Sequence, residues 1–275
     1  MRETEHKGAI KIPVQIAYVK RTGIALAACV IAAAASPFGQ GFEFLYQTLG
    51  GGIYATSGSV PSPFGMLVVG IPPLIFCYLF SDYVKEGLSH AGSSIFTRTA
   101  RRSTWFRKRI IHLAGFVCIY SLFGTLLSTL VQFAMSDGNA FLLLNPSTQN
   151  FWAILEFLVV ATILNALMLL TLLIPINILS LHADAVVCFI AVMAMYFSSL
   201  LICAALPHDA TALLVPLLPT TQGVFAWHDT PLAHAMSGQG IIEGFSLLHS
   251  SVYLFVLVGL EVALAMTLAK RFELS

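Results

Sequence analysis

The chain of 275 residues alternates between long apolar segments and shorter polar ones. Six of the apolar segments are long enough for membrane-spanning helices, because about 20 apolar residues cross the hydrocarbon core of a bilayer. The predicted spans are residues 22–38, 64–83, 110–135, 151–176, 185–206 and 242–269. This pattern predicts an all-α membrane protein in which residues 22–275 form a single domain of six transmembrane helices.

Two of the polar segments are expected to have structure of their own. Residues 1–21 mix apolar and basic positions, which is typical of a helix that lies in the cytoplasmic membrane interface. Residues 207–241 are too long for a simple turn, and their apolar run at 210–218 is too short to span a membrane. We therefore predict an outer re-entrant hairpin before the sixth helix. The alternatives are an unstructured tail for the first segment and an ordinary outer loop for the second.

The composition supports a membrane protein, because 57% of the residues are hydrophobic and only 10% are charged. A soluble domain carries about 25% charged residues. The lipid membrane is therefore an expected partner, and nucleic acid is not. The five cysteines all fall within apolar segments and form no CxxC pair. We interpret them as packed thiols rather than as disulfides or metal ligands.

The basic residues set the predicted orientation. All 14 Lys and Arg residues lie in three segments, at the N-terminus, within 83–109 and at the C-terminus. The segments 39–63, 136–150 and 207–241 contain none. Lys and Arg collect on the cytoplasmic side of membrane proteins, so six spans with both termini in the cytoplasm place every positive charge on one side. The short loop 177–184 falls on the same side by parity.

The sequence contains no motif for catalysis or metal binding. The dipeptide Gly-Lys does not occur, so the chain has no P-loop with which to hydrolyse a nucleotide. No pair of histidines has the spacing of metal ligands on one helix face. We predict no catalytic residue, no metal site and no cofactor in this chain. Four histidines near the outer segment are expected at the surface, with a metal or pH-sensing role as the alternative. They are His208, His228, His234 and His249.

Three polar side chains inside the predicted spans are candidates for function, namely Glu156, Asn165 and Glu261. An ionisable residue within the membrane costs a few kcal/mol when it has no partner, so it is a functional hypothesis by default. The competing interpretation is structural, with Glu261 protonated or bonded to a neighbouring helix or subunit. Glu156 is close to the outer face, which favours the structural interpretation for that residue. Asn165 is a candidate for a polar contact between helices.

The segment 83–109 is the only long basic stretch between two spans. It begins with Glu86-Gly87-Leu88, continues with small residues, and ends in the basic run RTARRSTWFRKR. Anchoring at anionic lipid headgroups explains part of the charge at 107–109. It does not explain the length of the segment or the apolar pair Ile95-Phe96. A contact with a soluble partner accounts for both.

This segment and the order of the spans resemble the permease subunits of the ABC-2 type of ATP-binding-cassette transporters, in particular the small permeases of bacteriocin-immunity and peptide exporters. The resemblance extends over the whole chain in architecture and over 83–109 in motif. It implies a cytoplasmic coupling helix between helices 2 and 3 that docks on a cytosolic ATPase subunit, with the loop 177–184 as a second contact. The residues that it assigns to ATPase coupling are Glu86, Ser93, Ser94, Ile95, Phe96, Arg98 and Arg101.

The resemblance further implies a complex of two permease chains, identical or homologous, with two ATPases in a bacterial plasma membrane. ATP and Mg would bind to the ATPases, and this chain would perform no covalent chemistry. The expected function is export of an amphipathic, peptide-like or lipid-like substrate. Two alternatives stay open. An ion-coupled secondary transporter would use Glu261 and Glu156, and an intramembrane enzyme would need a nucleophile and a base at matched depth, which the sequence does not offer.

Overall fold

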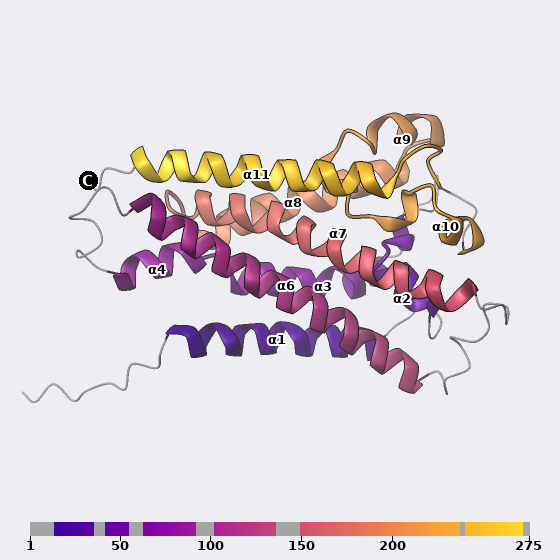
Figure 1. The fold of residues 1–275 in the computed structure, drawn as a ribbon, viewed down its shortest axis with the longest axis horizontal. Helices are drawn as coiled ribbons and strands as arrows, with labels where there is room; N and C mark the ends of the chain where they lie inside the picture. Colours follow the sequence, from indigo (N-terminus) through magenta and orange to yellow (C-terminus); the bar gives the residue numbers. More distant parts are fainter. Residues whose placement is uncertain are drawn as a thin grey trace, which may run out of the picture.

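The computed structural model describes residues 14–35, 42–54, 63–91, 102–135, 149–236 and 240–271. Within these ranges the regular structure is helical and contains no strand. Six helical segments are long and apolar enough to cross a membrane, which confirms the prediction of an all-helical membrane protein with six spans. The long helices lie side by side along the longest axis of the molecule (Figure 1).

Five of the spans lie within single helices, and the second continues from one helix into the next. The long helices are α1 (Val14–Ala34), α3 (Pro63–Leu79), α6 (Arg102–Met135), α7 (Gln149–Leu179), α8 (Ala185–Ala205) and α11 (Leu247–Arg271). A turn joins α3 to α4 (Tyr83–Ala91), and the second span runs over both. The remaining described elements are short: α2 (Phe42–Thr48), η1 (Gly52–Tyr54), α9 (His208–Leu214), η4 (Pro219–Thr221), η5 (Phe225–Trp227) and α10 (Pro231–Met236).

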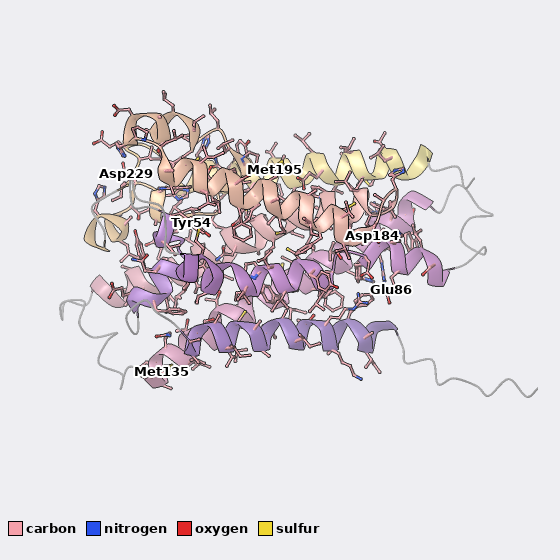
Figure 2. The ribbon with its side chains drawn as sticks, turned by 180° about the vertical axis from the view of Figure 1, so that it is seen from behind. Tyr54, Glu86, Met135, Asp184, Met195 and Asp229 are labelled. Carbon is pink, nitrogen blue, oxygen red and sulfur yellow. The ribbon has the colours of Figure 1, made fainter. Side chains whose placement is uncertain are left out.

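The two ends of the bundle differ in chemistry. The start of α1, α4, the start of α6 and the end of α11 lie together at one end, which we call the basic end because it holds Arg21 and Arg109 (Figure 1). The elements α2, η1, α9 and α10 lie at the other, which we call the opposite end. Figure 2 marks the basic end by Glu86 and Asp184, and the opposite end by Tyr54, Met135 and Asp229. That α1 begins where α11 ends agrees with an even number of spans. The cytoplasmic location of the basic end stays a prediction.

Several helix boundaries differ from the predicted ones. The helix α1 begins at Val14, so no boundary separates the predicted interfacial helix from the first span, and residues 1–13 lie outside the described part. The helix α6 begins at Arg102 rather than at residue 110. Arg and Lys favour helices, and their long stems let the charged groups reach water while the helix continues. The basic run therefore extends the helix instead of ending it.

The segment between α8 and α11 does not confirm the predicted re-entrant hairpin. Its described part consists of α9, the turns η4 and η5, and α10, of which the longest has seven residues. Pro216 lies two residues after the end of α9, and Pro219 begins η4. Proline disfavours helical backbone at its own position and at the residue before it. The apolar run at 210–218 is therefore helical only up to Leu214, at the end of α9.

The helix α11 lies at the edge of the bundle, where it packs against α6 and α7. Only 11% of its span is buried, compared with 56% for α7. Large apolar side chains such as Leu248, Phe255 and Leu260 are exposed along it. Exposed apolar side chains are the expected outer surface of a helix that faces lipid tails.

Candidate functional site

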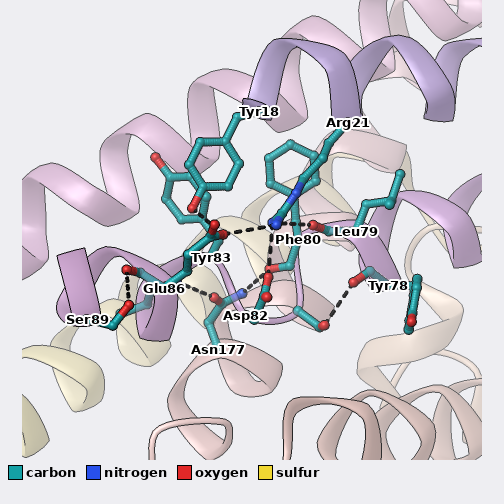
Figure 3. Close-up of polar contacts among 12 residues, drawn as sticks. Tyr18, Arg21, Tyr78, Leu79, Phe80, Asp82, Tyr83, Glu86, Ser89 and Asn177 are labelled. Carbon is teal, nitrogen blue, oxygen red and sulfur yellow. Dashed lines mark hydrogen bonds and ion pairs between the residues drawn. The ribbon is translucent and has the colours of Figure 1, made fainter. Parts of the chain in front are cut away.

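A charged and aromatic cluster joins α1 to α4 at the basic end (Figure 3). The hydroxyl of Tyr18 donates a hydrogen bond of 2.8 Å to Oε2 of Glu86. Arg21 lies 3.0 Å from the same carboxylate oxygen through Nη2, and 3.1 Å from Oδ1 of Asp82 through Nη1. Its Nη1 also donates to the carbonyl of Leu79 at 3.0 Å. One arginine of α1 thus holds both the turn after α3 and the first turns of α4.

Arg109 brings α6 into the same cluster. Its Nη2 donates to the hydroxyl of Tyr18 at 2.9 Å and to the backbone carbonyl of Tyr83 at 3.0 Å. The guanidinium lies 3.8 Å from the centre of the Tyr83 ring, a cation–π contact. Gly87 makes room for it, because a Cβ atom at that position would lie 2.6 Å from Nε of Arg109. The cluster contains two positive and two negative side chains, counting Arg21, Asp82 and Glu86 with Arg109.

Asn177 attaches the end of α7 to the turn before α4. Its side chain is fully buried. Nδ2 donates to the carbonyl of Phe80 at 2.9 Å, and Oδ1 accepts from the backbone N–H of Val84 at 2.9 Å. Lys85 adds a hydrogen bond of 3.1 Å from Nζ to the carbonyl of Ala183, in the loop before α8. The helix α4 is therefore fixed to α1, α6 and α7 at once.

Of the predicted coupling residues, Glu86 belongs to the described part of the chain and the others do not. Glu86 lies in the cluster, where Tyr18 and Arg21 contact its carboxylate. Ser93, Ser94, Ile95, Phe96, Arg98 and Arg101 lie outside the described residues. The loop 177–184 lies beside α4. Its expected contact with an ATPase stays a prediction. The interpretation of Arg109 as a lipid anchor is wrong, because its side chain turns inward onto Tyr83, whereas Arg107 and Lys108 are exposed.

A cavity of about 140 Å³ lies inside the bundle. Residues of α1, α2, α3, α6, α7 and α8 line it, together with the turn at 223–224. The lining that the described residues form is mostly apolar, with hydroxyl groups and one amide and without a charged side chain. The predicted polar residue Asn165 is among the lining residues, and its Nδ2 donates to the carbonyl of Leu49 at 3.2 Å. This bond joins α7 to the turn after α2, and the predicted contact of Asn165 with another helix stays a prediction.

The structure separates the two predicted intramembrane carboxylates from the cavity. Glu156 is exposed on α7. Glu261 is half-buried on α11, and its Oε2 atom is buried without a hydrogen-bond partner. Neither residue lines the cavity.

The opposite end holds a buried hydrogen-bond chain that the sequence did not reveal. His228, Gln222 and Ser250 are fully buried. Nδ1 of His228 lies 2.9 Å from the carbonyl oxygen of Val224, and Nε2 lies 2.7 Å from Oγ of Ser250. Oγ of Ser250 lies 2.7 Å from Oε1 of Gln222. The chain ties the turn at 222–228 to the first turn of α11.

Burial lowers the pKa of His228 to about 4, although the backbone carbonyls beside Nδ1 oppose the shift. The ring is therefore neutral at pH 7. Its Nδ1 proton faces the carbonyl of Val224, which leaves the Ser250 hydroxyl with one proton for two acceptors, Nε2 and Oε1 of Gln222. The expectation of a surface histidine is wrong for His228, and it is correct for His208, His234 and His249, which are exposed. Among the described residues, no three His, Cys, Asp or Glu side chains are placed to hold a metal.

Comparison of the chain with protein-family models, curated proteins and solved structures finds no match.

Proposed function

We propose that this chain is the membrane-spanning subunit of an ATP-binding-cassette transporter of the ABC-2 type. Separate cytosolic ATPase subunits would drive it, and it would export an amphipathic, peptide-like or lipid-like substrate. A second permease chain, identical or homologous, would complete the unit in a bacterial plasma membrane. The proposal rests on the six spans and on the sequence resemblance in 83–109.

The cluster at the basic end is the observation that carries the proposal. A motor outside the membrane must be linked by direct contacts to the helices that it moves. Tyr18, Arg21 and Arg109 link α4 to α1 and α6, and Asn177 links it to α7. A force applied to the segment after α4 would reach three spans through these contacts. Shear and rigid-body shifts of packed helices are common forms of switching.

The test is purification of the tagged chain from cells that produce it, in a mild detergent. We expect an ATPase subunit of the ATP-binding-cassette class to co-purify. The double variant Arg98→Glu/Arg101→Glu should lose that subunit and still elute as a folded chain. Arg107→Glu is the matched control, because Arg107 is exposed on α6 and is assigned to the membrane surface. A chain that purifies alone and moves its substrate with a proton gradient and no ATP would contradict the proposal.

An ion-coupled secondary transporter is the second candidate, and one observation favours it. Oε2 of Glu261 is buried in a membrane span without a hydrogen-bond partner. Such a carboxyl group is a candidate proton site. Glu156 does not share this environment, because it is exposed on α7. The test uses vesicles that contain only this chain. If the chain takes up its substrate with a proton gradient and Glu261→Gln abolishes this uptake, the result favours this candidate.

A further inference from the structure

The cavity inside the bundle has the features of a binding site. Its volume of about 140 Å³ is close to that of an engineered apolar cavity of about 150 Å³ that takes up benzene. We propose that it binds one uncharged amphipathic molecule, with an apolar part the size of a single aromatic ring and one hydroxyl group. The proposal does not rest on the transport function, because the cavity is formed by this chain alone.

The lining excludes a charged ligand. Among the described residues, no Asp, Glu, Lys, Arg or His side chain borders the cavity, and the apolar groups include Phe44, Val68, Leu169 and Phe197. An ion that leaves water for such a site loses its hydration without gaining a counter-charge. The apolar body of a neutral molecule loses only its contact with water, which favours binding. The charge of the ligand is therefore zero.

Ser121 supplies a hydrogen-bonding group for the ligand hydroxyl. It lines the cavity on α6, and its Oγ atom is buried without a hydrogen-bond partner. A buried hydroxyl that lacks a partner costs about 1–3 kcal/mol. Rotation about the single Cα–Cβ bond redirects it between staggered positions. A ligand oxygen in the cavity would give this hydroxyl the partner that the protein does not provide.

The proline pair leaves two carbonyls of α3 without their usual donor. Pro72 and Pro73 lie inside the helix and have no N–H to donate to the carbonyls four residues earlier. Those carbonyls belong to Val68 and Val69, and both residues line the cavity. In membrane helices, neighbouring groups satisfy carbonyls that proline releases. A ligand hydroxyl can accept a hydrogen bond from Ser121, and it is also able to donate to a carbonyl of this kind.

The binding experiment uses the chain alone in lipid nanodiscs and ¹⁹F NMR with three single-ring compounds. We expect 4-fluorobenzyl alcohol to give a saturable bound resonance that unlabelled benzyl alcohol displaces. The compound without a hydroxyl, 4-fluorotoluene, should bind roughly ten-fold more weakly, because it leaves the polar groups unpaired. The charged compound 4-fluorobenzoate should give no bound resonance. Empty nanodiscs provide the signal of compound dissolved in lipid.

Two glycines of α6 provide matched variants. Gly124 lines the cavity, and a Cβ atom there would lie 3.3 Å from Sγ of Cys29, which is also a lining residue, so Gly124→Leu adds a large side chain at the cavity wall. Gly115→Leu points into open space, with no atom within 4 Å of its Cβ. The bound resonance should disappear in Gly124→Leu and persist in Gly115→Leu. A resonance that is equal in both variants, or equal affinities for the three compounds, would overturn the proposal.

Ser121→Ala decides the outcome if Gly124→Leu does not fold. This variant removes the unpaired hydroxyl and should fold at least as stably as the parent chain. It should bind 4-fluorobenzyl alcohol roughly ten-fold more weakly, with the affinity for 4-fluorotoluene unchanged. Unchanged binding of the alcohol would overturn the assignment of Ser121. Binding is measured without an ATPase, so a failure here is distinct from a failure of the transport proposal.

Discussion

At the basic end, Arg21, Asp82, Glu86 and Arg109 hold helices together by charge, whereas at the opposite end Gln222, His228 and Ser250 do so without a formal charge. The charged side chains are partly exposed, with exposed fractions of 25% for Arg21 and 24% for Glu86. The neutral chain is fully buried. Water and salt weaken exposed ion pairs, but they do not reach a buried hydrogen bond.

This difference in burial suggests different mechanical properties for the two ends. A buried and connected hydrogen-bond network is costly to open, because each separated group is left without a partner. A partly exposed cluster can exchange protein contacts for water at lower cost. The charged cluster between α1, α4 and α6 can therefore rearrange while the opposite end keeps its geometry, and the buried Asn177 keeps α4 attached to α7. That arrangement suits a protein that a partner moves from the basic end.

The largest expected effect is a loss of stability on acidification that originates at His228. Its pKa is about 4 in the folded protein and 6.5 as an ordinary value. The unfolded chain therefore binds this proton first, and the contribution of about 3 kcal/mol present above pH 6.5 is lost as the pH falls to 4. The free energy of unfolding in nanodiscs, determined by pulse proteolysis at pH 7.5 and at pH 4, measures this loss.

His228→Phe is the control for this prediction. The phenyl ring can keep the stacking of the imidazole on Phe245, whose ring centre lies 4.3 Å away, but it does not titrate. The variant should lose less stability than the parent chain over the same pH range, even though it starts from a lower value. The same loss in both proteins would show that other groups cause the pH dependence.

Substitution of Gly87 tests the close packing at the basic end. In Gly87→Ala the new methyl group must displace the guanidinium of Arg109, which lies within 2.8 Å of the Cβ position. Moving the guanidinium breaks its hydrogen bonds to Tyr18 and Tyr83 and its cation–π contact, so we expect a loss of about 2 kcal/mol in the free energy of unfolding. Gly115→Ala is the matched control. It meets no atom and should stabilise the helix by about 0.5–1 kcal/mol.

The smallest expected effect concerns the ion pair between Arg21 and Glu86. A double-mutant cycle with Arg21→Gln and Glu86→Gln should give a coupling energy of about 1 kcal/mol at low salt, because both side chains are partly exposed. The coupling should shrink in 1 M salt, where the screening length is about 3 Å. The more exposed pair of His234 and Asp229 serves as the comparison and should show less coupling. If salt leaves the coupling energy of Arg21 and Glu86 unchanged, the basic end is stabilised, like the opposite end, by contacts that water and salt do not reach.

Hydropathy was sufficient to predict most of the fold. The predicted span 185–206 matches α8 (Ala185–Ala205) closely, because Asp184 caps its start and Pro207 follows its end. The predicted span 151–176 falls inside α7 (Gln149–Leu179). Long apolar segments have few alternatives in a membrane, since their backbone groups must be bonded within the segment. Boundaries were missed where basic residues continue a helix, as at Arg102.

The sites were harder to predict, because their members are distant in sequence. Tyr18, Glu86 and Arg109 come together only through the packing of α1, α4 and α6. Nothing in a mixed polar segment distinguishes an arginine that turns inward from one that anchors to lipid. Asn177 had a weak signal, as an amide at the end of a long apolar span. For His228, a polar outer segment suggested exposure, and only the packing of Phe245 and α11 buries it.

The peripheral position of α11 has a consequence for the order in which the protein is made. Every residue that lines the cavity lies between Cys29 and Val224, so the ribosome has synthesised the whole lining before it begins α11 at Leu247. The last helix reaches the membrane after the other spans can already have packed. Ser250 of α11 then forms its hydrogen bonds with Gln222 and His228, which attach α11 to the turn at 222–228. The cavity lining is thus complete in the chain before α11, which adds Leu254 and Ala265 to the core and Ser250 to the hydrogen-bond chain.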